Sequence, residues 1–127
     1  MKLTNANRSI LAVTAILLII SSCQYHSESE LIVGPWKYVS ITRNDSNIIN
    51  ISDDDFFQIK ADSTFQYAVH SVKKQMSGVW SYNAHTLHLK YLKPDTLRHF
   101  KINVLSNHDL ELQEGKVIYK LKKVHTE

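Results

Sequence analysis

Apolar and polar residues alternate with a period of two through most of the chain after residue 33. In residues 85–91, for example, Leu87 and Leu89 share one face, and His88 and Lys90 share the other. Such alternation is typical of half-buried β-strands, especially where β-branched and aromatic residues are frequent. The pattern predicts eight strands, at residues 34–42, 56–60, 64–70, 75–82, 85–91, 96–105, 109–113 and 116–124.

Short polar turns separate most of these segments, and none carries an apolar stripe of helical period long enough to cover a sheet. Sequential hairpins without a crossover helix favour an antiparallel meander. A meander of eight strands buries its apolar face and removes its edges by closing on itself. We therefore predict an all-β protein, an eight-stranded antiparallel up-and-down β-barrel.

The longest interruption is the polar, Asn-rich segment 43–52, which we predict to be a loop. Ser52 and Asp55 resemble a capping box, and residues 53–55 suit the first turn of a short helix. The three consecutive aspartates also raise the alternative of a calcium site. They lack the ligand spacing and the central glycine of a calcium-binding loop.

The first 22 residues differ in composition from the rest of the chain. Lys2 and Arg8 supply positive charge, and residues 10–20 form an apolar run broken only by Thr14. As a helix this run is about 16 Å long, roughly half of a bilayer core, so it is too short to span a membrane. Its length fits the apolar region of a secretory signal peptide.

Two small residues, Ser21 and Ser22, lead from this run into Cys23, the single cysteine. This order resembles the lipobox of bacterial lipoproteins. The resemblance implies cleavage before Cys23 and acylation, with palmitate, of its thiol and of the new amino terminus. The alternative is an ordinary secretory peptide with a chance cysteine. Two or three acyl chains hold a protein stably on a membrane.

We therefore predict a signal peptide at residues 1–22, a polar tether at 23–33 and a barrel at 34–124. Gln24 stands where lipoproteins retained at the inner membrane tend to carry Asp, so we expect anchoring at the outer membrane, on its periplasmic or cell-surface face. Glu28 and Glu30 distantly resemble the acidic tracts of some surface-exported lipoproteins.

Charge and motifs argue against several functions. The 127 residues carry a formal charge of +3, but the part after residue 22 has 13 basic and 12 acidic side chains, about +1. This balance offers no long-range field for nucleic acid. One cysteine excludes an intramolecular disulfide and a cysteine zinc site. Glycine-rich phosphate loops and hydrolase motifs are missing from the sequence, so we expect neither an enzyme nor a cofactor.

The seven histidines raise a metal hypothesis. His85 and His88 are three residues apart and so lie on opposite faces of a strand. His88 and His99 are expected on the outer faces of adjacent strands, where they are candidate cross-strand neighbours. Two imidazoles make a weak site at best, so we expect surface histidines and no metal.

One short pattern occurs twice: Gly34-Pro35-Trp36-Lys37-Tyr38 and Gly78-Val79-Trp80-Ser81-Tyr82. Glycine beside an indole lets the ring lie against neighbouring backbone. The two tryptophans are therefore either core-forming plugs or parts of an aromatic ligand clamp.

Four segments, taken in order, are similar to the lipocalin-like domains of small bacterial lipoproteins. They are Gly34–Ile41, Phe57–Phe65, Ser77–Tyr82 and Leu110–Leu112. The resemblance implies a calycin-type β-barrel, extracytoplasmic and usually without known catalysis, and leaves the ligand open. Ser63 departs from the pattern, because the family turn usually carries glycine there.

We predict that the barrel binds a small hydrophobic or amphipathic ligand. The expected binding residues are Trp36, Tyr38, Phe65, Tyr67, Trp80, Tyr91, Arg98, Phe100 and Tyr119. Arg98 shares its face with Phe100, so it meets either a ligand carboxylate or Glu114 in an ion pair. The alternative is a structural or interaction protein of the cell envelope, with its lumen filled by side chains. An interior void of roughly 300 Å³ or more would indicate a binder.

Overall fold

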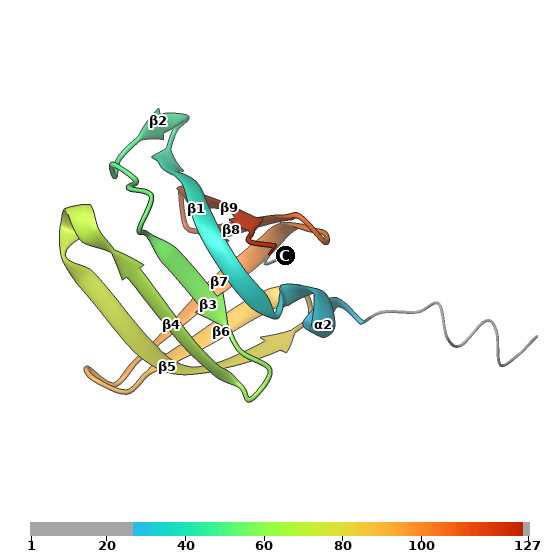
Figure 1. Ribbon diagram of the computed structural model, residues 1–127. Helices are drawn as coiled ribbons and strands as arrows, with labels where there is room; N and C mark the ends of the chain where they lie inside the picture. The colour runs from blue at the N-terminus through green and yellow to red at the C-terminus, as the bar shows by residue number, and fades with distance from the viewer. Residues whose placement is uncertain (1–26, 126–127) are drawn as a thin grey trace, which may run out of the picture.

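The computed structural model describes residues 27–125, and the predicted signal peptide, Cys23 and Gln24 lie outside this range. Within these described residues, nine strands and two short helices follow one another (Figure 1). They are α2 (Glu28–Ile32), β1 (Gly34–Arg43), β2 (Ser46–Asn47), β3 (Phe56–Ile59), β4 (Thr64–Val69), the 3₁₀ turn η1 (His70–Val72), β5 (Lys74–Asn83), β6 (Thr86–Tyr91), β7 (Thr96–Leu105), β8 (Asp109–Glu114) and β9 (Val117–Lys123). Among residues 27–125, no helix has the length and apolar composition that crossing a bilayer requires.

Eight of the strands form a closed antiparallel barrel. From β3 to β9 each strand pairs with the next, β1 pairs with β3, and β9 pairs back with β1. The closing register runs from Trp36 opposite Lys123 to Arg43 opposite Val117. The predicted fold class is therefore confirmed. The two-residue strand β2 was not predicted, and it pairs only with the far end of β1.

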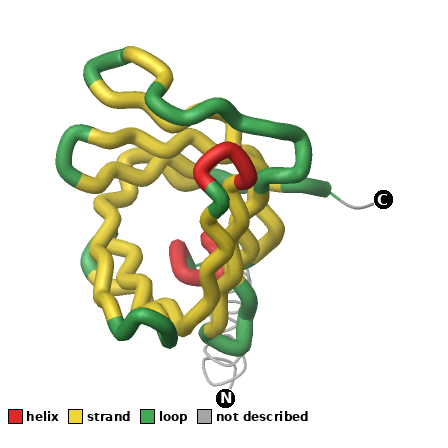
Figure 2. Tube along the Cα trace, turned by 90° about the vertical axis from the view of Figure 1, so that its left-hand side faces the viewer, coloured by secondary structure: helices red, strands yellow, loops and turns green. Residues whose placement is uncertain are grey.

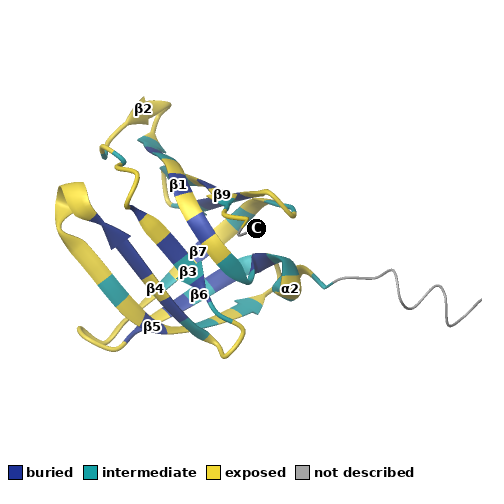
Figure 3. Cartoon of the chain, viewed as in Figure 1, coloured by how far each residue is buried: buried dark blue, intermediate teal, exposed yellow. Residues whose placement is uncertain are grey.

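Two bulges interrupt the alternation of inward and outward side chains. They lie between Tyr38 and Ser40 in β1 and between Ile102 and Val104 in β7. Strict alternation from Phe100 places Val104 inside the barrel, but the bulge turns it outward, and it is 45% exposed. Along β3 buried residues alternate with more exposed ones, as the bands in Figure 3 show, whereas Tyr67, Ala68 and Val69 at the end of β4 are all buried.

The predicted helix at residues 53–55 is not present. The backbone N–H of Ser52 does donate to the Asp55 carboxylate, as in a capping box. However, residues 53–54 form only a turn, and β3 begins at Phe56. The reason is that the Asp55 side chain also accepts hydrogen bonds from His70, the first residue of η1 directly after β4, which draws the chain into the sheet.

The predicted polar tether through residue 33 is wrong in its last part. Residues 28–32 form α2, and Ile32 is fully buried in the core. The indole N–H of Trp36 donates to the Ile32 carbonyl at 2.8 Å, and Lys123 Nζ donates to the Leu31 carbonyl at 2.9 Å. Figure 2 looks along the barrel, with α2 lying across its far end. The helix thus closes one end of the barrel.

Candidate binding site at the open end of the barrel

Aromatic side chains fill most of the lumen. Ring centroids are 6.1 Å apart between Phe57 and Phe65, and 5.6 Å apart between Phe65 and Tyr91. The space left among them is about 20 Å³, enough for one water molecule. The described residues thus do not enclose the large void that ligand binding in the lumen would require. The lumen below the mouth is a packed core.

A wider hollow lies above this core, at the end of the barrel opposite α2. We call it the cup; its volume is about 180 Å³. The residues that line it come from β1, the loop after β2, β4, η1, β5, β7 and β9. They are Tyr38, Ile41, Ile49, Tyr67, Val69, Val72, Lys74, Arg98 and Tyr119. Four of these residues also line the small space below, so the cup has an aliphatic rim and a polar floor.

The wall formed by the loop is held in place by Asp55. Its side chain is fully buried and accepts hydrogen bonds from the backbone N–H and hydroxyl of Ser52 and from the backbone N–H of His70. Burial alone raises the pKa of this carboxyl, but hydrogen bonds from the His70 and Ser52 backbones outweigh burial and lower the pKa to about 2. The carboxylate therefore ties the loop that carries Ile49 to the end of β4.

Arg98 forms the charged part of the floor. Its Nε donates to Glu114 Oε2 at 2.8 Å, and its Nη2 donates to the other oxygen of the same carboxylate. Nη1 donates to the Tyr91 hydroxyl at 2.7 Å, and Nη2 also reaches the Tyr119 hydroxyl at 3.2 Å. The hydrogen bond with Glu114 is the main cause that raises the pKa of Arg98. Arg98 was predicted to meet either a ligand carboxylate or Glu114, and in the structure it forms the ion pair with Glu114.

The sequence similarity of this chain agrees with its architecture. A family model described as "Lipocalin-like domain" matches residues 32–112, more than half of the chain. The protein belongs to the lipocalin-like domain family. A search of curated proteins finds no match.

Two solved structures share this lipocalin-like fold. An uncharacterized protein from Bacteroides eggerthii is 13% identical, with a TM-score of 0.59 over 72% of this chain and 98% of that chain. A lipocalin-like protein from Bacteroides uniformis is 15% identical, with a TM-score of 0.60 over 73% of this chain and 98% of that chain. At these identities the likeness shows the fold alone.

The indoles of both tryptophans in the lipocalin-like barrel form hydrogen bonds to backbone carbonyls, away from the cup. Trp36 is fully buried under α2 and is bonded to it. The indole N–H of Trp80, on β5, donates at 2.8 Å to the carbonyl of Lys60, which starts the turn between β3 and β4. Neither tryptophan lines the cup. These contacts favour the interpretation of the tryptophans as core-forming plugs.

The remaining predicted binding residues divide into two groups. Tyr38, Tyr67, Arg98 and Tyr119 meet at the floor of the cup, and Phe100 lines the small space below it. Phe65 and Tyr91 are buried and line neither space.

The aliphatic rim of the cup is not distinguished by the sequence pattern. Ile41 and Val69 lie in predicted strands, where a residue that lines a hollow has the same pattern as a core residue. Val72 lies in a segment predicted as a turn, between residues 70 and 75. Ile49 lies in the segment predicted as a polar loop, where the cluster of isoleucines at residues 48, 49 and 51 was the available clue.

The predicted histidine pair is present on the outer wall. His88 and His99 are directly opposite on β6 and β7, with ring centroids 4.7 Å apart and hydrogen bonding between the two Nδ1 atoms. Within residues 27–125, no group of three or more potential ligands is arranged to hold a metal ion.

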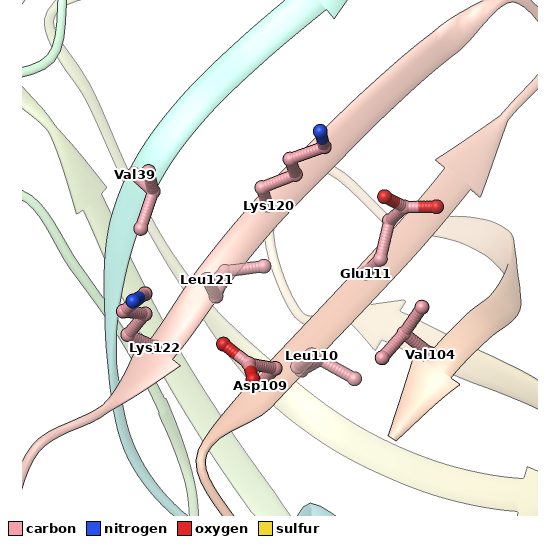
Figure 4. Close-up of a pocket in the computed structure, with 8 residues that line it drawn as sticks. All are labelled: Val39, Val104, Asp109, Leu110, Glu111, Lys120, Leu121 and Lys122. Atoms are coloured by element: carbon pink, nitrogen blue, oxygen red, sulfur yellow. The ribbon is translucent and has the colours of Figure 1, made fainter. Parts of the chain in front are cut away.

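A second hollow is an open groove on the outer face, with a volume of about 270 Å³. Figure 4 shows Val39 at one side of the groove and Val104 at the other, with β8 and β9 between them. Between the two valines, the groove is lined by two cross-strand pairs of opposite charge on β8 and β9, Glu111 with Lys120 and Asp109 with Lys122. Val104 reaches this groove because the bulge in β7 turns it outward, whereas Val39 faces outward by the regular alternation of β1.

Proposed function

We propose that this protein is an exported, non-enzymatic lipoprotein of the cell envelope that binds a small amphipathic ligand at the open end of its barrel. The observation that carries the proposal is the cup, an aliphatic rim above a floor of tyrosine hydroxyls and Arg98. Such a hollow suits a ligand with one apolar and one polar part.

The size of the cup limits the ligand. Pockets for drug-sized molecules measure roughly 300–1,000 Å³, whereas the cup measures about 180 Å³. The ligand is therefore a small molecule or the terminal part of a longer one. Its apolar part contacts Ile41, Ile49, Val69 and Val72, and its polar part points to the floor.

The lipid anchor rests on the sequence of residues 1–23, and the fold is compatible with it. Cys23 precedes the first described residue, Ser27, by four residues, which reach at most about 14 Å. The helix α2 follows at once and closes one end of the barrel. Anchoring through Cys23 would hold this closed end near the membrane and let the cup open away from it.

The binding proposal is tested with ethylbenzene, titrated into the ¹⁵N-labelled soluble domain and followed by amide chemical shifts. We expect saturable shifts at cup residues and a loss of at least tenfold in affinity in Val72→Trp, which places an indole in the cup. Val79→Trp is the matched control, because Val79 is similarly exposed, 41% against 43%, but lies outside the cup. Absence of saturable shifts at the cup would reject the proposal.

The anchor is tested separately, on the full-length chain expressed in a Gram-negative host. Mass spectrometry of the mature protein should find an amino terminus at Cys23 that carries acyl chains. Cys23→Ser should leave the protein unacylated and released from the membrane fraction. A wild-type protein without acyl groups would reject the anchor and leave the cup untouched.

The outer groove supports a second candidate function, an interaction protein of the envelope. Val39 and Val104 are 50% and 45% exposed, and paired charges lie between them. A photo-crosslinking residue at position 104 should then capture one stoichiometric partner from intact cells. The same residue at position 79, also an exposed valine, should capture none. Equal capture at both positions would contradict this function.

A further inference from the structure

Tyr38 has a hydroxyl group with no hydrogen-bond partner among the described residues. The residue is only 5% exposed, and its ring packs on Phe57 with centroids 6.3 Å apart. No fully enclosed side-chain oxygen or nitrogen within residues 27–125 lacks a partner, so the phenolic oxygen must reach an open surface. Tyr38 lines both the cup and the space below it. Its O–H therefore faces a hollow where a ligand group can accept a hydrogen bond from it.

Tyr67 offers a second donor. Its hydroxyl is 3.0 Å from that of Tyr91, which accepts a hydrogen bond from Arg98 Nη1. Tyr91 is buried and does not line the cup, so its proton has an acceptor only if it points to Tyr67. The chain of hydrogen bonds then runs from Arg98 through Tyr91 to Tyr67. The proton of Tyr67 is left free to point into the cup.

Tyr119 offers a third donor. Its oxygen accepts a hydrogen bond from Arg98 Nη2, and its own O–H donates to no described residue. A guanidinium that donates to a phenol withdraws electron density, which strengthens the phenol as a donor and weakens it as an acceptor. Burial is the main cause that raises the pKa of Tyr38, Tyr67 and Tyr119, so all three remain protonated donors at neutral pH.

The floor carries no unbalanced charge, because both oxygens of Glu114 accept hydrogen bonds from Arg98. An ionised ligand group would lose its hydration there without meeting a free cation. Lys74 is the one charged side chain on the rim of the cup, and it is exposed.

We propose that the cup selects ligands that present an uncharged hydrogen-bond acceptor, the oxygen of a carbonyl group, to the hydroxyls of Tyr38, Tyr67 and Tyr119. This inference rests on the proposed function of the cup and adds the chemical class of the ligand. The carbonyl oxygen lies at the floor, and the apolar part of the ligand lies along the aliphatic rim.

Three probes of nearly equal shape test the inference: acetophenone, with a carbonyl; benzoate, with a charged carboxylate; and ethylbenzene, with neither. Each is titrated into the ¹⁵N-labelled domain at pH 7 and followed by amide shifts. We expect acetophenone to bind about fivefold to tenfold more tightly than ethylbenzene, the gain of about one net hydrogen bond. Benzoate should bind more weakly than acetophenone.

Tyr38→Phe removes the free hydroxyl and keeps the ring. We expect it to reduce the preference for acetophenone over ethylbenzene at least threefold, with ethylbenzene binding nearly unchanged. Tyr82→Phe is the matched control, since the Tyr82 hydroxyl contacts Glu28 at the opposite end of the barrel and should not affect the preference.

The possible failures are distinguishable. If none of the three probes binds at the cup, the proposed function fails. If all bind with equal affinity, or Tyr38→Phe leaves the preference unchanged, only the carbonyl inference fails. Tighter binding of benzoate than of acetophenone would show that the cup takes anions and would overturn the requirement for an uncharged group.

Discussion

The imidazole Nδ1 of His70 lies 2.7 Å from Oδ1 of Asp55, the one buried charged residue within residues 27–125. Asp55 ends the long loop after β2, and His70 begins η1 after β4. The carboxylate also accepts the backbone N–H groups of Ser52 and His70. This single side chain therefore fixes both the loop and the η1 turn that form the rim of the cup.

Asp55→Ala should destabilise the protein by about 2–3 kcal/mol, because it leaves the partly buried N–H groups of Ser52 and His70 without their acceptor. Denaturant unfolding of the domain measures this loss. Asp53→Ala is the control, since the Asp53 side chain is fully exposed and its contact with Lys37 is long, 3.4 Å. An equal effect in both variants would contradict the role of Asp55.

Stability should fall as pH decreases from about 4 to 2. The pKa of Asp55 is about 2 in the folded protein, below its ordinary value of 3.8, so the ionised form stabilises the fold. This contribution is complete above the unfolded pKa and is lost as the carboxyl is protonated. Asp55→Ala should therefore differ from wild type at pH 6 and approach it near pH 2. A constant difference across this range would contradict the prediction.

Gly78→Ala should destabilise the barrel by about 3 kcal/mol or prevent folding. A Cβ at this position would lie 2.0 Å from the Lys90 carbonyl oxygen and 2.9 Å from a Phe65 ring carbon, so the β5 and β6 backbones would have to separate. Gly115→Ala is the comparison. Gly115 has a φ of +59° and open space around it, so alanine there should cost only about 1 kcal/mol. Thermal unfolding of both variants distinguishes steric from conformational cost.

Ser63→Gly should stabilise the protein by about 0.5–1 kcal/mol. Ser63 has a φ of +71° in the turn between β3 and β4, a conformation that glycine adopts without strain. The turn is held by the Ser63 carbonyl, which accepts a hydrogen bond from the backbone N–H of Trp80 at 2.8 Å, and this bond does not involve the Ser63 side chain. The change in denaturation midpoint measures the effect. A decrease in stability would show that the serine side chain matters to the turn.

Arg98→Met should destabilise the protein by about 2 kcal/mol, because it leaves the partly buried Glu114 carboxylate and the hydroxyls of Tyr91 and Tyr119 without their donor. Arg98→Lys should not restore stability, since an ammonium cannot form the same bidentate contact. A double-mutant cycle of Arg98→Met with Glu114→Met measures the coupling, expected at about 1–2 kcal/mol. Additive effects would indicate that the ion pair does not stabilise the fold.

The alternation of side chains along the chain was sufficient to predict the eight barrel strands and their inward aromatic faces. Side-chain direction in a strand follows from local backbone geometry, and short turns leave few ways to pair neighbouring strands. From the same parity, Glu114 was a candidate partner of Arg98, beside a ligand carboxylate, and His88 and His99 were candidate cross-strand neighbours; the structure contains both pairs. It also gathered Tyr38, Tyr67 and Tyr119 on the inner face.

Only the tertiary structure decided which inward residues fill the lumen and which line a hollow. The bulge in β7 turns Val104 outward, the loop after β2 brings Ile49 over the mouth, and His70 keeps Asp55 buried as a carboxylate. Each of these features depends on contacts between segments distant in sequence. A pattern of period two has the same appearance for a side chain packed in the core and for one that faces the cup.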